Sequence, residues 1–205
     1  MYIDLKNKPI LVVGGGAVAL RKTEKLLPFG PAVTVVAPRL CPELAALEAV
    51  SLVERPFADS DVNGMELVLA ATDDRALNHH IARLCREQHI PVNVADSAQD
   101  SSFLFPALIR RGELTIGIST GGGSPTVSRM VREQVEAALP DKLPELLDLM
   151  EGLRLRVREL LPSEAARAGL LRRCWAASMV LGRPLTEEEV QEILTSAQAE
   201  KGEQL

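Results

Sequence analysis

The sequence predicts an α/β protein: a Rossmann-type parallel sheet, followed by a small β-hairpin and helix segment and then by a C-terminal helical domain. Three observations support this. An apolar run at residues 9–13 stops on three glycines and passes into a helical pattern, a β-branched run follows at 33–37, and only helical patterns occur after residue 140. Strand, helix and strand in this order make a βαβ nucleotide-binding unit. We therefore expect domains at residues 1–105, 106–139 and 140–205.

The glycine-rich turn after the first strand has the spacing of a dinucleotide-binding loop. It reads Gly14-x-Gly16-x-x-Ala19. In such loops the first glycine makes a tight turn, the second lets a pyrophosphate approach bare backbone, and a small third residue lets the helix pack on the strand. The phosphates then lie on the helix N-terminus. Glycines at a strand end also form plain tight turns, but the second strand at 33–37 favours the nucleotide-binding interpretation.

The second strand ends without the acidic residue that bonds the adenosine ribose in many NAD sites. The chain reads Val36-Ala37-Pro38-Arg39 at this place. Arg39 either pairs with a 2′-phosphate, which would favour NADP, or packs along the adenine while backbone groups hold the ribose. The spacing alone leaves both interpretations open.

Two later strands also end in polar residues. The strand at 67–71 ends in Thr72-Asp73-Asp74, and the strand at 91–95 ends on Asp96. Ligands of open parallel sheets bind beyond the carboxyl ends of the strands, so these residues are expected to border a cofactor. Alternatively, Asp73 or Asp74 caps the following helix, and we expect capping to be the role of these aspartates. Asp96 either takes a proton from a substrate or starts an Asx turn.

The remaining elements follow from the same kinds of pattern. A short strand is expected at 51–54, and residues 103–110 and 114–118 are expected to pair as a hairpin. The turn after it, up to Gly123, is either an anion-binding turn or a hinge. Ser124 should cap a helix that runs to about residue 139, and further helices should begin at Ser163 and Thr186.

Composition and charge exclude several classes of function. Aromatic residues make up only 3% of the chain, which argues against nucleic-acid binding through stacked bases. The chain has no basic start followed by a long apolar run and no run of membrane-spanning length, so we expect a cytoplasmic protein without a membrane partner. Residues 106–183 hold 12 Lys and Arg against 9 Asp and Glu, although the net charge is −5. This basic segment either lines a cleft for a polyanionic ligand or, more commonly, forms a solvated helix face.

Metal binding by protein side chains is not expected. The three cysteines lie far apart in the sequence, and the three histidines lack the spacing of a metal-binding helix. These residues are Cys41, Cys85, Cys174, His79, His80 and His89. The cysteines are interpreted as small apolar fillers of the core.

Five blocks of the sequence occur in a characteristic order. They are Val12–Lys22, Ala70–Asp74, Asn93–Asp96, Ser101–Pro106 and Gly121–Pro125. Together they resemble the precorrin-2 dehydrogenase and sirohydrochlorin ferrochelatase family, which also forms the N-terminal module of siroheme synthase. The resemblance extends over nearly the whole chain and is looser after residue 140.

The resemblance implies an NAD-binding Rossmann domain, a central segment that mediates homodimerisation and a small helical domain over the active site. In this family NAD is the oxidant although the second strand lacks an acidic residue. The residues expected to bind the cofactor are Gly14, Gly16, Ala17, Val18, Pro38, Arg39, Thr72 and Asn93. Of these, the resemblance places Ala17 and Val18 near the pyrophosphate, and Pro38 and Arg39 at the adenosine end.

The family's catalytic aspartate matches Asp96 of this chain. The implied reaction removes a proton and a hydride from precorrin-2 and gives sirohydrochlorin and NADH, with Asp96 as the general base. Some members also insert ferrous iron as a second substrate. Arginines of the basic segment are candidates to pair with the carboxylates of precorrin-2, and Ser119, Thr120 and Gly121 are expected to contact it. A rival hypothesis is a regulatory Rossmann module that senses NAD without catalysis.

Overall fold

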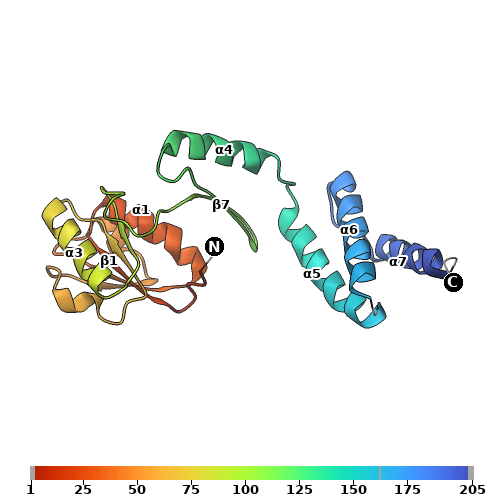
Figure 1. Ribbon diagram of the computed structural model, residues 1–205, viewed down its shortest axis with the longest axis horizontal. Coiled ribbons are helices and arrows are strands. Elements are labelled where there is room, and N and C mark those ends of the chain that lie inside the picture. The colour runs from red at the N-terminus through yellow and green to blue at the C-terminus, as the bar shows by residue number, and fades with distance from the viewer. Residues whose placement is uncertain (1–2, 162, 203–205) are drawn as a thin grey trace. The chain divides into compact units, whose positions relative to one another are not determined.

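A computed structural model describes residues 3–161 and 163–202, and its contacts divide the chain into two compact units (Figure 1). The first unit ends at Phe105 and the second begins at Pro106. The first unit contains a parallel sheet with its covering helices, and the second contains a hairpin and the C-terminal helices.

The first unit is built on a five-stranded sheet in the order β3-β2-β1-β4-β5, with every neighbouring pair parallel. The strands are β1 (Pro9–Val13), β2 (Ala32–Val36), β3 (Val50–Val53), β4 (Leu67–Ala70) and β5 (Val92–Val94). Leu11 of β1 lies opposite Thr34 of β2 on one side and Val68 of β4 on the other. The strand order therefore reverses at β1, which creates a crevice for ligands beside its carboxyl end. The predicted Rossmann-type sheet is confirmed.

Helices cover both faces of this sheet because side chains alternate along each strand. The helices are α1 (Ala17–Leu26), α2 (Pro42–Ala45) and α3 (Arg75–Glu87), with the 3₁₀ helices η1 (Leu27–Phe29) and η2 (Asp59–Val62). Ile10 and Val12 of β1 face a cluster that includes residues of α1 and α2. Leu11 and Val13 face the opposite cluster, which includes residues of α3. This double cover explains why the strands are apolar at nearly every position.

The hairpin in the second unit is shorter than the sequence predicts. Its strands are β6 (Ala107–Arg111) and β7 (Leu114–Ile118), whereas the first was expected from residue 103. Phe103 and Phe105 instead pack against the apolar cluster of the first unit, with ring centroids 5.6 Å apart. Alternating apolar residues can pack in a hairpin or against a neighbouring core. Here Phe103 and Phe105 pack against the core of the first unit. Pro106, which lacks an N–H, lies between the residues that pack on the first unit and the first strand of the hairpin.

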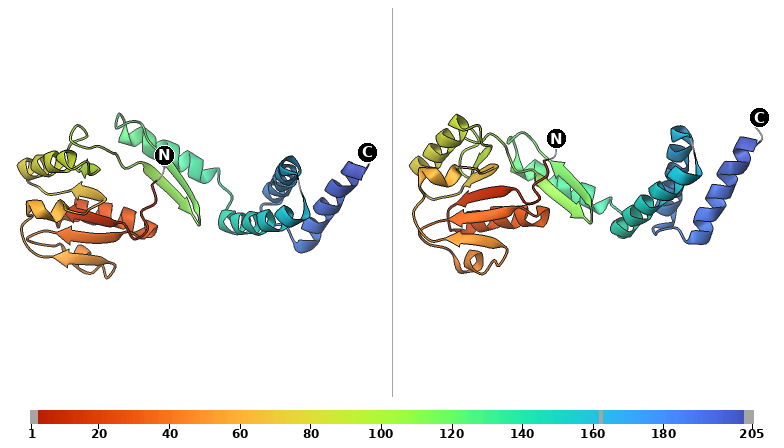
Figure 2. Two further views of the ribbon diagram at one scale, coloured as in Figure 1. Left: turned by 60° about the horizontal axis from the view of Figure 1, so that its bottom comes forward. Right: turned by 90° about the horizontal axis from the view of Figure 1, so that it is seen from below.

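The rest of the second unit is helical. Its helices are α4 (Pro125–Ala137), α5 (Leu143–Leu160), α6 (Glu164–Leu181) and α7 (Glu187–Gly202). Figure 2 shows α6 beside both α5 and α7, and these three helices share one apolar core. The core residues are Leu153, Val157, Leu161, Leu170, Cys174, Leu185, Val190 and Leu194.

The helix starts that the sequence predicts are present as hydrogen-bonded caps. Asp74 accepts bonds from two N–H groups in the first turn of α3, and Ser124 and Ser163 each accept one at the starts of α4 and α6. At α7, the Thr186 N–H donates to the Glu189 carboxylate, and the Glu189 N–H donates to the Thr186 hydroxyl. These local bonds satisfy donors that the helix itself leaves unpaired.

Candidate active site at the carboxyl ends of the strands

The turn between β1 and α1 needs glycine at its first two positions. Gly14 has a φ of +128°, and a Cβ there would lie 2.3 Å from the carbonyl oxygen of Ala71. A Cβ at Gly15 would lie 1.8 Å from the carbonyl oxygen of Arg39. The turn is therefore packed against the segments that follow β4 and β2, with no room for side chains at these two positions.

Gly16 has different surroundings, because a Cβ there would meet no heavy atom within 4 Å. It is the N-cap of α1, no side chain caps that helix, and its first turn contains no acidic residue. Ala17 and Val18 are exposed, whereas Ala19 is fully buried against the sheet. Unpaired N–H groups and the positive end of the helix dipole are thus open beside Gly16, an arrangement that binds phosphate groups. These residues fit the pyrophosphate of a dinucleotide.

Pro38 and Arg39 follow β2 and are both exposed. The backbone of Arg39 lies against Gly15, so this segment borders the glycine turn. The two residues predicted to contact the adenosine end are therefore next to the predicted pyrophosphate position.

The carboxyl ends of β4 and β5 are joined through Asn78, a residue of α3 that is 1% exposed. Its amide oxygen accepts bonds from the N–H of Thr72 at 3.2 Å and the Thr72 hydroxyl at 2.7 Å. Its amide nitrogen donates to the Thr72 carbonyl at 3.0 Å and to Oδ1 of Asp96 at 3.1 Å. No sequence motif indicated Asn78. The available signal was a polar residue between Leu77 and Ile81 on the apolar face of a helix.

Asp96 lies in the loop directly after β5, and its side chain is 34% exposed. Its second oxygen, Oδ2, is 3.5 Å from Nε of Arg75, a side chain that is itself 90% exposed. The same loop is held to α3 through Asp100, which lies 3.2 Å from Nδ1 of His79 and accepts a bond from Arg86 at 3.0 Å. These two partners lower the pKa of Asp100. Asp96 is thus a partly open carboxylate on a tethered loop, which suits it to accept a proton.

Asn93 of β5 is buried, and its amide is engaged within the protein. Its Oδ1 accepts a bond from Nζ of Lys22 at 2.6 Å, and its Nδ2 donates to the carbonyl of Phe103 at 2.9 Å. Nζ of Lys22 also lies 4.8 Å from the ring centroid of Phe105, and burial, aided by neighbouring positive charges, lowers the pKa of Lys22 to about 8. Lys22 was not selected from the sequence either. Contact between Asn93 and the cofactor stays a prediction.

The predicted substrate contacts lie in the second unit, in the exposed turn between β7 and α4. The Thr120 hydroxyl accepts a bond from the Ser124 N–H and lies 3.1 Å from the Ser128 hydroxyl. Ser119 accepts a bond from the N–H of Gly121 at 3.2 Å. The turn is therefore hydrogen-bonded to the start of α4, and its contact with a substrate stays a prediction.

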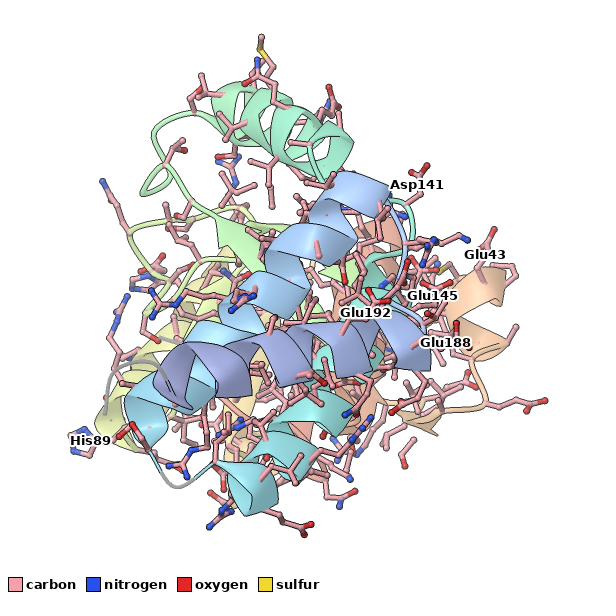
Figure 3. All side chains as sticks on the ribbon, turned by 90° about the vertical axis from the view of Figure 1, so that its right-hand side faces the viewer. Glu43, His89, Asp141, Glu145, Glu188 and Glu192 are labelled. Carbon is pink, nitrogen blue, oxygen red and sulfur yellow. The ribbon has the colours of Figure 1, made fainter. Side chains whose placement is uncertain are left out.

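Metal-ligating clusters are absent from the part of the chain that the structure describes, as no three His, Cys, Asp or Glu side chains gather there. Figure 3 shows His89 and Glu43 pointing outward on opposite sides of the first unit. The three cysteines are free thiols, and burial raises the pKa of Cys85 to about 11. Among the described helices, none has an apolar stretch that would cross a bilayer.

The second unit contains a pocket of about 400 Å³ that holds none of the predicted site residues. Its one arginine, Arg156, is already paired with both carboxylate oxygens of Glu187 at 2.7 and 2.8 Å. The chemistry of the strand ends, rather than this pocket, therefore defines the candidate site. The lining residues are Arg156, Glu159, Leu160, Gln191 and Leu194.

Two family models match the chain. A family described as NAD(P)-binding matches residues 1–107, just over half of the 205 residues. A second family, described as the central part of a sirohaem biosynthesis protein, matches residues 111–138. The first match contains the glycine turn and Asp96, and the second contains the turn before α4.

Curated relatives and one solved structure agree with these matches. The siroheme synthases of Thioalkalivibrio sulfidiphilus and Methylococcus capsulatus are 44% and 41% identical over 91% and 82% of this chain. The chain spans only 38% and 36% of their lengths. The structure of SirC, a precorrin-2 dehydrogenase, matches with a TM-score of 0.75 and 25% identity, over 97% of this chain and 98% of that one.

Proposed function

The chain belongs to the NAD(P)-binding family that also occurs in siroheme synthases, and from this premise we propose that it oxidises precorrin-2 to sirohydrochlorin with NAD. The observation that carries the proposal is the likeness to a precorrin-2 dehydrogenase over nearly the full length of both chains. This likeness includes the second unit as well as the cofactor-binding domain. It therefore favours an oxidation of that tetrapyrrole over a general dinucleotide function.

The first unit supplies the cofactor site. The backbone at Gly14, Gly16, Ala17 and Val18 would hold the pyrophosphate, because the glycines leave the backbone accessible and the N–H groups at the start of α1 have no side-chain cap. Pro38 and Arg39 would contact the adenosine end, with Thr72 and Asn93 nearer the strand ends. When bound, NAD supplies the acceptor for the hydride that leaves the substrate.

Asp96 is the proposed general base. The oxidation removes two hydrogens from precorrin-2, one as a hydride and one as a proton. The proton passes to Oδ2 of Asp96, since Oδ1 already accepts a bond from Asn78, whereas Oδ2 lies 3.5 Å from Nε of the exposed Arg75. From there it can leave to solvent, because the side chain is partly exposed.

The second unit is proposed to recognise the substrate. Ser119, Thr120 and Gly121 offer hydroxyl and backbone groups on an exposed turn. Precorrin-2 carries several carboxylates, and the basic segment of residues 106–183 contains arginines that suit them. Ferrous iron is proposed as a second substrate: the macrocycle offers four nitrogens, so insertion needs no cluster of protein ligands.

We further propose that the protein acts as a homodimer in the cytoplasm. On α4, Val127, Met130 and Val131 are 47%, 55% and 36% exposed and recur at the spacing of one helix face. An apolar stripe of this kind is typical of a contact between protein surfaces. Free thiols, two of them buried, are compatible with a reducing compartment.

The proposal is tested by anaerobic incubation with precorrin-2 and NAD, followed by the spectra of NADH and sirohydrochlorin. Asp96→Ala is expected to lower kcat by at least about 100-fold and to leave the affinity for NAD within about threefold. Glu54→Ala, which removes an exposed carboxylate directly after the edge strand β3, is the matched control and should stay near wild-type activity.

Wild-type protein that binds NAD tightly but neither binds nor oxidises precorrin-2 would favour the regulatory NAD-sensing module instead. Parallel titrations with NAD and NADP decide whether Arg39 binds a 2′-phosphate.

Addition of ferrous ion after the oxidation tests iron insertion through the appearance of siroheme. Sedimentation of Met130→Glu against wild type reports on the dimer, which the charge on α4 should dissociate.

A further inference from the structure

We propose that Asn78 is a positioning residue for Asp96: its amide holds one carboxylate oxygen, so that the other is presented to the substrate. This inference rests on the proposed oxidation and adds a residue to it. It concerns a side chain of α3 that no sequence motif indicated, and it gives a role to a polar group that is buried on the helix face packed against the sheet.

The orientation of the Asn78 amide is fixed by its own bonds. The oxygen accepts two bonds from Thr72, and the nitrogen donates one bond to Thr72 and one to Asp96. All four hydrogen-bonding positions of the amide are therefore used. A flipped amide would set its NH₂ against the N–H of Thr72, and its oxygen against the Thr72 carbonyl and the Asp96 carboxylate. These three contacts would be unfavourable, whereas the Thr72 hydroxyl can donate or accept.

The two oxygens of Asp96 consequently have different surroundings. Oδ1 accepts the bond from a side chain that is 1% exposed, at 3.1 Å. Oδ2 has Nε of Arg75 at 3.5 Å, and that side chain is 90% exposed and free to move in solvent. A bond to a buried, fully bonded amide restrains a carboxylate far more than a long contact to a mobile arginine. Oδ2 is thus the oxygen left for the proton.

Asn78 also connects the base to the cofactor rim. Thr72 lies two residues after the end of β4, and Asp96 lies two residues after the end of β5, so a single amide spans the ends of two neighbouring strands. The loop that carries Asp96 has a separate attachment to α3 through Asp100, His79 and Arg86. The loop as a whole can therefore stay in place when Asn78 changes, while the Asp96 carboxylate loses its fixed direction.

The first test is kinetic and uses the full chain. Asn78→Ala and Asn78→Asp are expected to lower kcat about 10- to 100-fold, because a displaced base loses alignment with the substrate. The KM values for NAD and precorrin-2 should stay within about threefold of wild type, which a general loss of structure would not produce. His80→Ala is the matched control: it truncates a histidine of the same helix that pairs with Asp59, outside the Asp96 loop, and kcat should change less than about twofold.

The second test needs neither substrate nor cofactor and keeps Asn78 in place. The side-chain NH₂ signals of Asn78 in an NMR spectrum should shift and exchange faster in Asp96→Ala than in wild type, and should stay close to wild type in His80→Ala. Unchanged signals in Asp96→Ala would overturn the assignment, even if the Asn78 variants fail to fold.

The two tests separate this inference from the proposed function. If the wild-type protein oxidises precorrin-2 and a folded Asn78 variant keeps wild-type kcat, the positioning role is wrong and the function stands. If the wild type does not oxidise precorrin-2, the function fails together with the catalytic use of Asn78, while the NMR signals still decide whether the amide holds Asp96.

Discussion

Gly14 and Gly16 lie two residues apart in the same turn, but a side chain would have opposite effects at the two positions. At Gly14 the backbone has a positive φ and the carbonyl of Ala71 occupies the Cβ position, so the constraint is internal to the protein. At Gly16 the Cβ would point into open space beside the start of α1, so any constraint comes from a ligand. Substitutions at these two glycines can therefore separate the effect of the turn on stability from its effect on NAD binding.

Gly14→Ala is expected to lower the free energy of unfolding by at least about 2 kcal/mol, through backbone strain and the overlap with Ala71. Gly16→Ala should leave the free energy of unfolding within about 1 kcal/mol and weaken NAD binding at least about 10-fold, because the methyl group fills the place of the phosphate. Denaturant unfolding and NAD titration measure the two effects. A stable Gly14→Ala, or a Gly16→Ala with unchanged NAD affinity, would contradict this division.

Lys22 is a half-buried amine whose bond to Asn93 joins α1 to β5. Burial lowers its pKa from the ordinary value of 10.5 to about 8. Since the unfolded chain keeps the ordinary pKa, it binds more protons than the folded chain between these two values. The free energy of unfolding should therefore rise with pH from about 8 to 10.5, as the cost of burying the charge disappears.

Lys22→Met should remove this rise, because methionine keeps the apolar stem and cannot bind a proton. Lys6→Met, which changes an exposed lysine in the same unit, should keep it. Thermal or denaturant unfolding across this pH range checks the difference between the two variants. If the free energy of unfolding rose equally in Lys22→Met and wild type, the pKa of Lys22 would not differ between the folded and the unfolded chain.

The start of helix α7 is held by a charged capping residue, Glu189. At the start of α7, Glu189 accepts bonds from the Thr186 N–H at 2.7 Å and from both terminal nitrogens of Arg183 at 2.7 and 2.9 Å. Chiefly through Arg183, these bonds lower the pKa of Glu189 to about 2 from 4.5. Its contribution to stability is therefore complete above pH 4.5 and lost as the pH falls toward 2.

Glu189→Gln should lower the melting temperature at neutral pH, and its difference from wild type should shrink as the pH falls from 4.5 toward 2. Glu188→Gln is the matched control, since the neighbouring carboxylate points to the surface of α7 in Figure 3. Circular dichroism melts over this pH range measure both variants. Equal melting temperatures for the two variants at neutral pH would contradict the role of Glu189.

The whole molecule consists of two units with separate cores. The two apolar clusters on the faces of the sheet contain residues only up to Phe105, and the cluster of the C-terminal helices starts at Leu149. The glycines of the cofactor turn and the partners of Asp96, which are Asn78 and Arg75 among the described residues, belong to the first unit. Our proposal therefore places cofactor binding in the first unit and substrate recognition in the second.

Residues 1–105 expressed alone are therefore expected to unfold cooperatively and to bind NAD within about 10-fold of the full chain's affinity. The same fragment should not oxidise precorrin-2, because the proposed substrate contacts lie after it. Differential scanning calorimetry, NAD titration and the precorrin-2 assay check the three expectations. A fragment that does not fold, or that oxidises precorrin-2 at the full rate, would contradict the placement of cofactor binding and substrate recognition in separate units.

Most of the fold was readable from the sequence because its signals are local. Apolar runs marked the strands, and Asp74, Ser124, Ser163 and Thr186 marked helix starts through bonds to residues two or three positions away. The glycine turn was predictable for the same reason. The hairpin strand was predicted too long because Phe103 and Phe105 carry an alternating pattern that does not say which layer will bury them.

The sequence by itself determined the order of the elements, the parallel sheet with its glycine turn, and the position of Asp96 at a strand end, since each depends on residues close together in the chain. Only the tertiary structure decided what holds that site together. The bond from Asn78 to Asp96 joins residues 18 positions apart, and the bond from Lys22 to Asn93 joins residues 71 positions apart. Such pairs form only when helices pack on the sheet in one register, which brings buried polar groups to partners that no local pattern specifies.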